Sequence, residues 1–205
     1  LVLLGGDLAD TRRQALRLLY ALRDLRAPMG VFAVPGNNDV EAFGSMDGVK
    51  AEVYAAAVGV YDRYTTEGLK EAIPFLGVGR QYIRFAREEP ELYRLLFLTR
   101  AREYSAMDSM RHLQTLVRST LTEVYHVTAE EADFNFRDLW LVVHSLATLI
   151  VTGDCPYSDA ELAGILTGFS LSIFKSIREI PGFAAGTFDR DAAFRALAGE
   201  TETLE

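Results

Sequence analysis

The chain has 205 residues, which is enough for one ordinary domain or for one domain with a partial second. Hydrophobic residues make up 49% and charged residues 24% of the sequence, a balance that excludes intrinsic disorder. The formal net charge of −8 argues against a stand-alone nucleic-acid-binding protein, because phosphate contacts require clustered Lys and Arg. The single cysteine, Cys155, has no partner for an intramolecular disulfide, so we expect a cytoplasmic protein.

Residues 1–39 predict a strand, a helix and a second strand. The apolar run 1–4 ends in Gly-Gly-Asp and indicates a buried parallel strand. Leucines at near-helical spacing predict a helix from Thr11 to about Arg26, ended by Pro28, and residues 31–34 predict the second strand. Together these elements form one βαβ unit, in which ligand side chains gather beyond the carboxyl ends of the strands.

Two motifs in this segment carry a family resemblance. The runs LLGGDLAD (residues 3–10) and VPGNND (residues 34–39) resemble two consecutive metal-site blocks of calcineurin-like metallophosphoesterases. Such enzymes use hard oxygen and imidazole ligands to hold two cations that bind phosphate and activate a water. The resemblance implies that Asp7 is a bridging carboxylate and Asn37 a ligand, with Asn38 where that family usually has a histidine.

The remaining ligands of that family do not follow. The upstream Asp-x-His block and the later histidine blocks have no match, and His112, His126 and His144 all fall in helical patterns. Two ligands cannot hold a catalytic metal pair, so we interpret Asp7 and Asn37 as vestigial. We expect no functional metal, no cofactor and no enzymatic activity, with a metal-dependent phosphoesterase as the alternative.

From Val49 onward the pattern is helical. Pro74 and Pro90 each fit the first turn of a helix, and the region between Arg100 and Met107 indicates a loop before a helix over 108–125. Capping boxes at residues 128–131 and 158–161 predict two further long helices, the first ending at Gly153 and the second at residues 181–182. The tail 184–205 predicts one weak helix.

The helix that begins at the first capping box is apolar around most of its circumference. Such a helix must be covered on more than one side, and a subunit interface is the expected cover. Its longest apolar stretch, 139–151, contains His144 and Ser145 and is too short to span a bilayer, so we expect no membrane.

Residues 43–183 resemble a second family. The runs GRQYIRFA (79–86), EPELYRLLF (89–97) and FRDLWLVVHS (136–145) resemble the C-terminal effector-binding and dimerisation domain of TetR-type transcriptional regulators. The resemblance implies a mainly α fold, a helical bundle preceded here by a short βαβ-like segment. It also implies a homodimer in which the last two long helices pair with those of a second subunit. The interface residues that we predict on these helices are Leu139, Val142, Val143, Leu146, Ile150, Leu162, Ile165, Leu166, Phe169 and Ile173.

The same resemblance implies a pocket for a small hydrophobic effector inside the bundle. Such pockets are mostly apolar, with a few polar groups that fix the orientation of the ligand. The predicted lining residues are Tyr82, Phe85, Tyr93, Phe97, Met110, Leu113, Trp140 and His144, with His112 and Gln114 as polar contacts. For each of them the alternative is an ordinary core position.

The DNA-binding helix-turn-helix of that family should precede residue 43, where the phosphoesterase-like segment stands instead. We therefore predict that operator DNA is a partner only where a helix-turn-helix is supplied. A dimer with no ligand, produced by a gene fusion, is the remaining alternative.

Overall fold

A computed structural model describes residues 2–22, 25, 31–99 and 105–198. The chain divides into two compact units, residues 1–57 and 58–205, and the division falls inside the long helix α3 (Met46–Leu69). The predicted family boundary near residue 43 lies just before this helix, and it stays a prediction.

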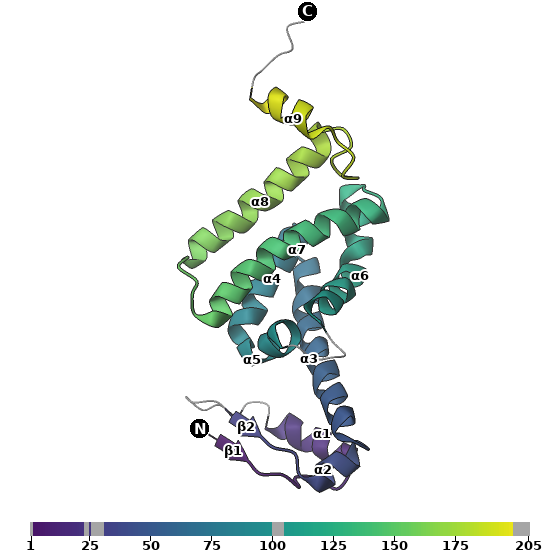
Figure 1. Ribbon diagram of the computed structural model, residues 1–205, viewed down its shortest axis with the longest axis vertical. Coiled ribbons are helices and arrows are strands. Elements are labelled where there is room, and N and C mark those ends of the chain that lie inside the picture. The colour runs from purple at the N-terminus through teal and green to yellow at the C-terminus, as the bar shows by residue number, and fades with distance from the viewer. Residues whose placement is uncertain (1, 23–24, 26–30, 100–104, 199–205) are drawn as a thin grey trace, which may run out of the picture. The chain divides into compact units, whose positions relative to one another are not determined.

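The first unit contains a two-stranded parallel sheet (Figure 1). Strand β1 (Val2–Leu4) pairs with β2 (Val31–Ala33) in the register that places Val2 opposite Val31. Helix α1 (Arg12–Ala21) lies between them in the chain, as the sequence predicted, and Thr11 caps it by accepting from the Gln14 N–H. The predicted end of this helix at Arg26 and Pro28 lies outside the described residues.

Helix α2 (Asn37–Ala42) follows β2 almost at once. The sequence pattern did not predict this helix. A helix begins here because Asp39 accepts a hydrogen bond from the Gly36 N–H, 3.0 Å away, and so caps the first turn.

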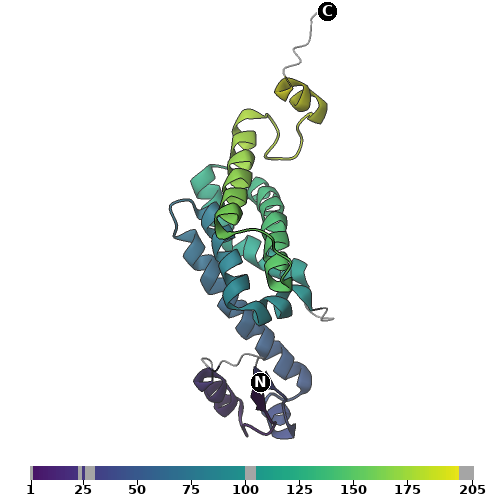
Figure 2. The same cartoon turned by 90° about the vertical axis from the view of Figure 1, so that its left-hand side faces the viewer.

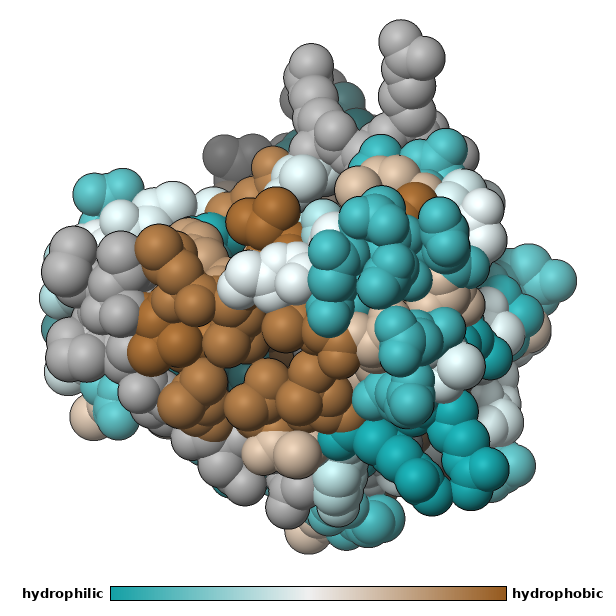
Figure 3. Space-filling view, turned by 90° about the horizontal axis from the view of Figure 1, so that it is seen from below, coloured by the Kyte–Doolittle hydropathy of each residue, from teal (hydrophilic) through white to brown (hydrophobic). Residues whose placement is uncertain are grey.

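The sheet of the first unit leaves apolar side chains uncovered. Leu3, Phe32 and Val34 are 71%, 55% and 66% exposed. Figure 3 shows apolar side chains gathered on the face viewed from below. Parallel strands are usually buried on both faces, and two strands are too few for an independently stable sheet. This unit therefore carries a strand pattern suited to a larger sheet.

Every secondary-structure element among the described residues of the second unit is a helix, which confirms the mainly α fold class (Figures 1 and 2). After the C-terminal part of α3 come α4 (Pro74–Glu88), α5 (Pro90–Tyr93), the π-helical segment η1 (Arg94–Leu98), α6 (Ala106–Tyr125), α7 (Ala129–Thr152), α8 (Asp159–Glu179) and α9 (Arg190–Leu197).

The ends of these helices follow local rules in the sequence. Thr128 and Ser158 make the predicted capping boxes, and Ser105 makes a third that sequence reasoning missed. Gly153, with φ of 84°, ends α7 in the left-handed conformation that glycine favours. His126 is the left-handed cap of α6, with φ of 56°, so it lies just beyond the helix and not inside it as predicted.

The core of the second unit forms around α4. This helix packs against α7, and α8 lies across both. Leu162, Leu166 and Ile173 supply the buried side of α8, whereas Leu171 on its other side is 64% exposed. One face of α8 therefore remains without a partner in the single chain.

Length and composition alone would allow α7 and α8 to cross a membrane. The predicted reason for excluding a membrane, that the apolar stretch is too short, thus does not hold for the whole helices. In α7, however, apolar side chains such as Leu139, Trp140 and Val143 are buried inside the unit. Core helices of soluble proteins pass the same test, so the finding is weak support for a membrane span.

Two glycines allow α3 and α4 to approach closely where the chain turns between them. A Cβ on Gly77 would lie 2.2 Å from the carbonyl oxygen of Gly68, and a Cβ on Gly68 would lie 2.7 Å from the backbone of Gly77. No side chain, not even that of alanine, fits between these backbones without moving one of the helices.

We predict that Gly77→Ala lowers the free energy of unfolding by about 1–3 kcal/mol, because the added methyl group forces the two backbones apart. Gly59→Ala is the matched control. Its Cβ meets nothing within 4 Å, so it should stabilise α3 by up to about 1 kcal/mol through helix propensity. Urea unfolding followed by circular dichroism measures both, and equal stability of the two variants would contradict the close approach.

Candidate functional site

The residues of the first unit that resemble phosphoesterase ligands form hydrogen bonds within the local fold. The Asp7 carboxylate accepts a hydrogen bond from the Asn38 N–H at 2.9 Å, at the first turn of α2. The Asn37 side chain donates to Asn38 Oδ1 at 3.0 Å. Among the described residues, no group of three or more His, Cys, Asp and Glu side chains is placed to hold a metal ion. The arrangement thus uses Asp7 as a helix-end acceptor.

Asp39, which sequence reasoning did not single out, is the central polar residue of this unit. It is buried, and it accepts from the Ala9 N–H at 2.9 Å as well as from Gly36. Burial raises the pKa of this carboxyl, but backbone N–H donors of Gly36 and of the loop after β1 outweigh that effect, and the pKa is lowered overall. The carboxylate therefore joins the ends of both strands to α2.

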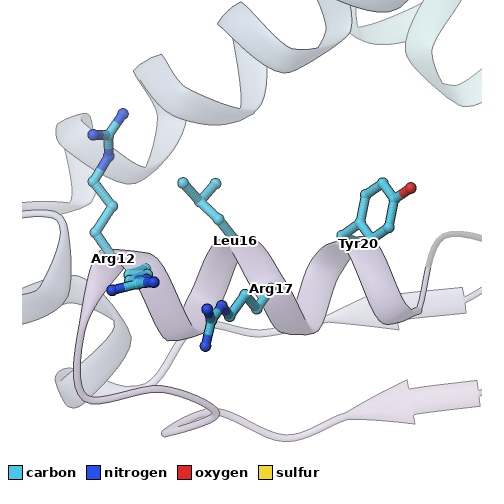
Figure 4. A pocket seen from close by; sticks show the side chains of 5 residues that line it. Arg12, Leu16, Arg17 and Tyr20 are labelled. Atoms are coloured by element: carbon cyan, nitrogen blue, oxygen red, sulfur yellow. The ribbon is translucent and has the colours of Figure 1, made fainter.

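A hollow of about 540 Å³ lies along the exposed face of α1. Arg12, Arg13, Leu16, Arg17 and Tyr20 line it (Figure 4). Arg12 forms an ion pair with Glu52. The hollow is large enough for a small molecule but is open to solvent and lies along a single helix, so it does not enclose a ligand.

The second unit holds a dense cluster of aromatic rings around His144. It combines Tyr61 from α3, Tyr82 from α4, Tyr93 from α5, Phe97 from η1, and Trp140 with His144 from α7. The Trp140 and His144 rings stack with centroids 4.5 Å apart and an interplanar angle of 8°. Five helical elements thus meet at one aromatic core.

Hydrogen bonds fix His144 within this cluster. Its Nδ1 lies 3.0 Å from the Tyr82 hydroxyl and 2.9 Å from the Tyr93 hydroxyl. The Tyr93 hydroxyl also lies 2.9 Å from Thr148 Oγ1 and 3.1 Å from the His144 carbonyl oxygen. These contacts give Nδ1 of a histidine on an otherwise apolar helix its hydrogen-bond partners.

The cluster is uncharged at neutral pH. Burial raises the pKa of Tyr61 and of Tyr82 well above the ordinary value, and it raises the pKa of Tyr93 to about 12. Burial lowers the pKa of His144, which keeps the imidazole neutral. The site is thus a set of neutral hydrogen-bonding groups within an apolar shell.

Two polar atoms of the cluster lack a hydrogen-bond partner. The Tyr61 hydroxyl and Trp140 Nε1 are buried and unpaired. The indole N–H lies close enough to lower the pKa of Tyr61 slightly against the larger effect of burial, but the two groups do not reach hydrogen-bond geometry. Buried polar groups are nearly always paired, so these two require an explanation.

The space beside Trp140 is almost closed. A void of only about 10 Å³ lies between α4, α6 and α7. The side chains and backbone around it belong to Val78, Gly79, Tyr82, Leu113, Phe136, Leu139, Trp140 and Val143. Pockets for small molecules usually measure about 300–1,000 Å³, so a ligand must displace side chains to enter.

The structure brings most of the predicted pocket residues together. Tyr82, Phe85, Tyr93, Phe97, Trp140 and His144 form one cluster, and Met110 and Leu113 are buried on α6. The predicted polar contacts lie elsewhere, since His112 contacts Asp62 at 2.8 Å and Gln114 donates to the Asp133 carbonyl. Sequence reasoning missed Tyr61 and Thr148, whose residue types carry no signal of their own.

The predicted interface residues fall into two groups. Several are buried within the chain itself: Leu139, Val143, Leu146, Leu162, Leu166 and Ile173. The others remain partly exposed: Val142, Ile150, Ile165 and Phe169. The apolar residues that are exposed on the same helices are Leu141 and Leu171, at 49% and 64%.

We predict that lowering the pH from 7.5 to 6.0 destabilises the chain, in part through His144. Its folded-state pKa lies below the ordinary value of 6.5, so the unfolded state binds the proton first. The stability due to the neutral ring is complete above pH 6.5 and is lost as the pH falls toward the folded-state pKa.

Chemical denaturation at both pH values measures this loss in the wild type and in His144→Gln. The variant should lose less stability than the wild type over this window, because the other titrating groups are common to both proteins. An equal loss in the two proteins would show that His144 does not contribute.

Comparison with known proteins identifies part of the second unit. Residues 75–166 match the family model described as tetracyclin repressor-like, C-terminal domain. No curated protein and no solved structure matches the chain. The matched range runs from α4 to the middle of α8 and includes Tyr82, Tyr93, Trp140 and His144. The chain therefore carries a C-terminal domain of the tetracyclin repressor-like family, the domain that its sequence resembled.

Proposed function

We propose that this chain is the effector-sensing, dimerising part of a TetR-type transcriptional regulator and that it catalyses no reaction. The observation that carries the proposal is the neutral aromatic cluster around His144. Most of its residues lie within the matched range 75–166, and the cluster contains two unpaired buried polar atoms, one on Trp140 inside that range and one on Tyr61 before it. A sensor needs a site whose packing differs between the free and bound states. A cluster that is closed when empty and short of hydrogen bonds meets that requirement.

The proposed dimer forms through the exposed face of α8 together with neighbouring residues of α7. Leu171 and Leu141 are the exposed apolar side chains there, and a Cβ added to Gly164 or Gly168 would meet open space. A second subunit would cover this face and bring α7 and α8 of both chains into one bundle.

Operator binding would need a helix-turn-helix, which the βαβ unit does not resemble. We propose that the chain alone has no operator affinity and acts in the cytoplasm as a soluble dimer. The alternative is a dimer that binds no ligand. The very small void of about 10 Å³ favours this alternative.

We predict that Leu171→Glu converts the dimer to a monomer, because it places a charge on the proposed apolar interface. The mass in solution, measured by analytical ultracentrifugation, should fall to half that of the wild type. Leu116→Glu on α6, where the leucine is 36% exposed, is the control and should leave the dimer intact. A dimer that survives Leu171→Glu would place the interface elsewhere.

We predict that a screen of small hydrophobic compounds raises the unfolding temperature of the chain, since a ligand that binds only the folded state stabilises it. The hits should lose their effect in Tyr93→Phe or His144→Gln, which alter the cluster. A screen in which no hydrophobic compound stabilises the chain would favour the dimer with no ligand.

A further inference from the structure

The two unpaired atoms specify the chemistry of the ligand. We propose that the effector is a neutral, mainly apolar molecule with a carbonyl or ether oxygen that accepts hydrogen bonds from Trp140 Nε1 and from the Tyr61 hydroxyl. This inference rests on the proposed sensing function and adds the class of ligand. Its basis is the pair of buried, unpartnered atoms at the centre of the cluster.

The indole N–H can only donate, so whatever pairs with it must accept. Trp140 is 4% exposed and borders the void between α4, α6 and α7. Tyr61 is 1% exposed, and its hydroxyl feels the same indole N–H. Tyr61 does not line the void. A ligand oxygen that accepts from Trp140 Nε1 at the void would also accept from the Tyr61 hydroxyl once the surrounding side chains move to admit it. The free energy that the empty site loses by leaving them unpaired would then favour binding.

The surroundings select against a charged ligand. Lys and Arg do not occur among the residues around the void, so an anion would meet no counter-charge there. The Asp62 carboxylate acts on Tyr61, and it opposes a second negative charge there. A carboxylate ligand would therefore lose its hydrating water without gaining a counter-charge in the site.

A cation is disfavoured for a different reason. Aromatic cages hold ammonium ions against the open faces of their rings. Here His144 covers one face of Trp140, and Tyr61 packs edge-to-face with both Tyr82 and Phe97. The group that Trp140 leaves unpaired is its N–H, the positive edge of the ring, which repels a cation.

The site can open without breaking the network that holds His144. The void is bordered by apolar side chains of Leu113, Phe136, Leu139 and Val143, and by Gly79, which has no side chain. Rotation of these apolar groups enlarges the space beside Trp140. The hydrogen bonds among His144, Tyr93 and Thr148 use other atoms, and they can persist in the bound state.

The test uses three naphthalene probes of nearly equal size on the full chain. The probes are 2-acetylnaphthalene, which offers a carbonyl oxygen, 2-isopropylnaphthalene, which offers none, and 2-naphthoate, which is an anion. Calorimetry gives the affinities. The sequence contains one tryptophan, so a single indole N–H signal in a ¹⁵N-correlated NMR spectrum reports on Trp140 directly.

We expect the ketone to bind about tenfold more tightly than the hydrocarbon, the value of a hydrogen bond to an otherwise unpaired buried group. The ketone should shift the Trp140 indole signal downfield, and 2-naphthoate should bind most weakly. Tyr61→Phe should reduce the advantage of the ketone and leave the affinity for the hydrocarbon unchanged. Trp140→Phe, measured by calorimetry, should also reduce that advantage, and the thermal unfolding of both variants shows that they fold.

Four results would overturn the inference. Equal affinity for ketone and hydrocarbon would mean that the unpaired atoms are not used, as would an indole signal that does not move. Tightest binding of 2-naphthoate would mean an anionic effector, and in either case the proposed sensing function would stand. If no probe binds, the inference fails, whereas the sensing function is decided separately by its own screen of hydrophobic compounds.

Discussion

The Tyr93 hydroxyl is the contact on which the helical unit depends. It lies within hydrogen-bond distance of Thr148, of His144 Nδ1 and of the His144 carbonyl, so one oxygen links the short helix α5 to the middle of α7. Tyr82 on α4 approaches the same imidazole nitrogen. Without these hydroxyls the histidine would be a polar ring in an apolar helix, with an unpaired nitrogen that costs about 1–3 kcal/mol. The network therefore pairs the polar His144 side chain of α7 and joins α4, α5 and α7 at this residue.

The same cluster also contains two buried polar atoms that have no hydrogen-bond partner. The hydrogen bonds of the cluster join His144, Tyr82 and Tyr93. The Tyr61 hydroxyl and Trp140 Nε1 form none. The π-helical turn η1 adds to this, because π-helical segments are rare and occur frequently at functional sites, and Phe97 in that turn packs against both Tyr61 and Trp140. A core optimised only for stability would place an apolar ring at such positions. The unpaired atoms and the irregular backbone lie together, on one side of the imidazole network.

Local signals in the sequence determined the helix ends that were predicted well. Thr128, Ser158 and Gly153 act within one turn of their own positions, so their effect can be read without the fold. The contacts of the site could not be read in this way. Tyr61 and Trp140 are far apart in the chain, and apolar periodicity on α7 cannot separate residues that face their own subunit from residues that face another. Leu139 and Val143, which were predicted at the interface, are buried within the chain on a helix that packs against α4.

In the N-terminal unit, the polar residues that resemble metal ligands take part in hydrogen bonds within the fold. Gly-Asn-Asn-Asp suggested metal ligands because carboxylate and amide oxygens at the ends of parallel strands suit cations. In this unit backbone N–H groups pair with the carboxylates: Asp7 accepts from Asn38, and Asp39 accepts from Gly36 and Ala9. A lowered pKa at Asp39 follows from these donors as readily as it would from a bound ion. Each carboxylate already has N–H donors as partners, so a cation would have to compete with the helix that those carboxylates cap.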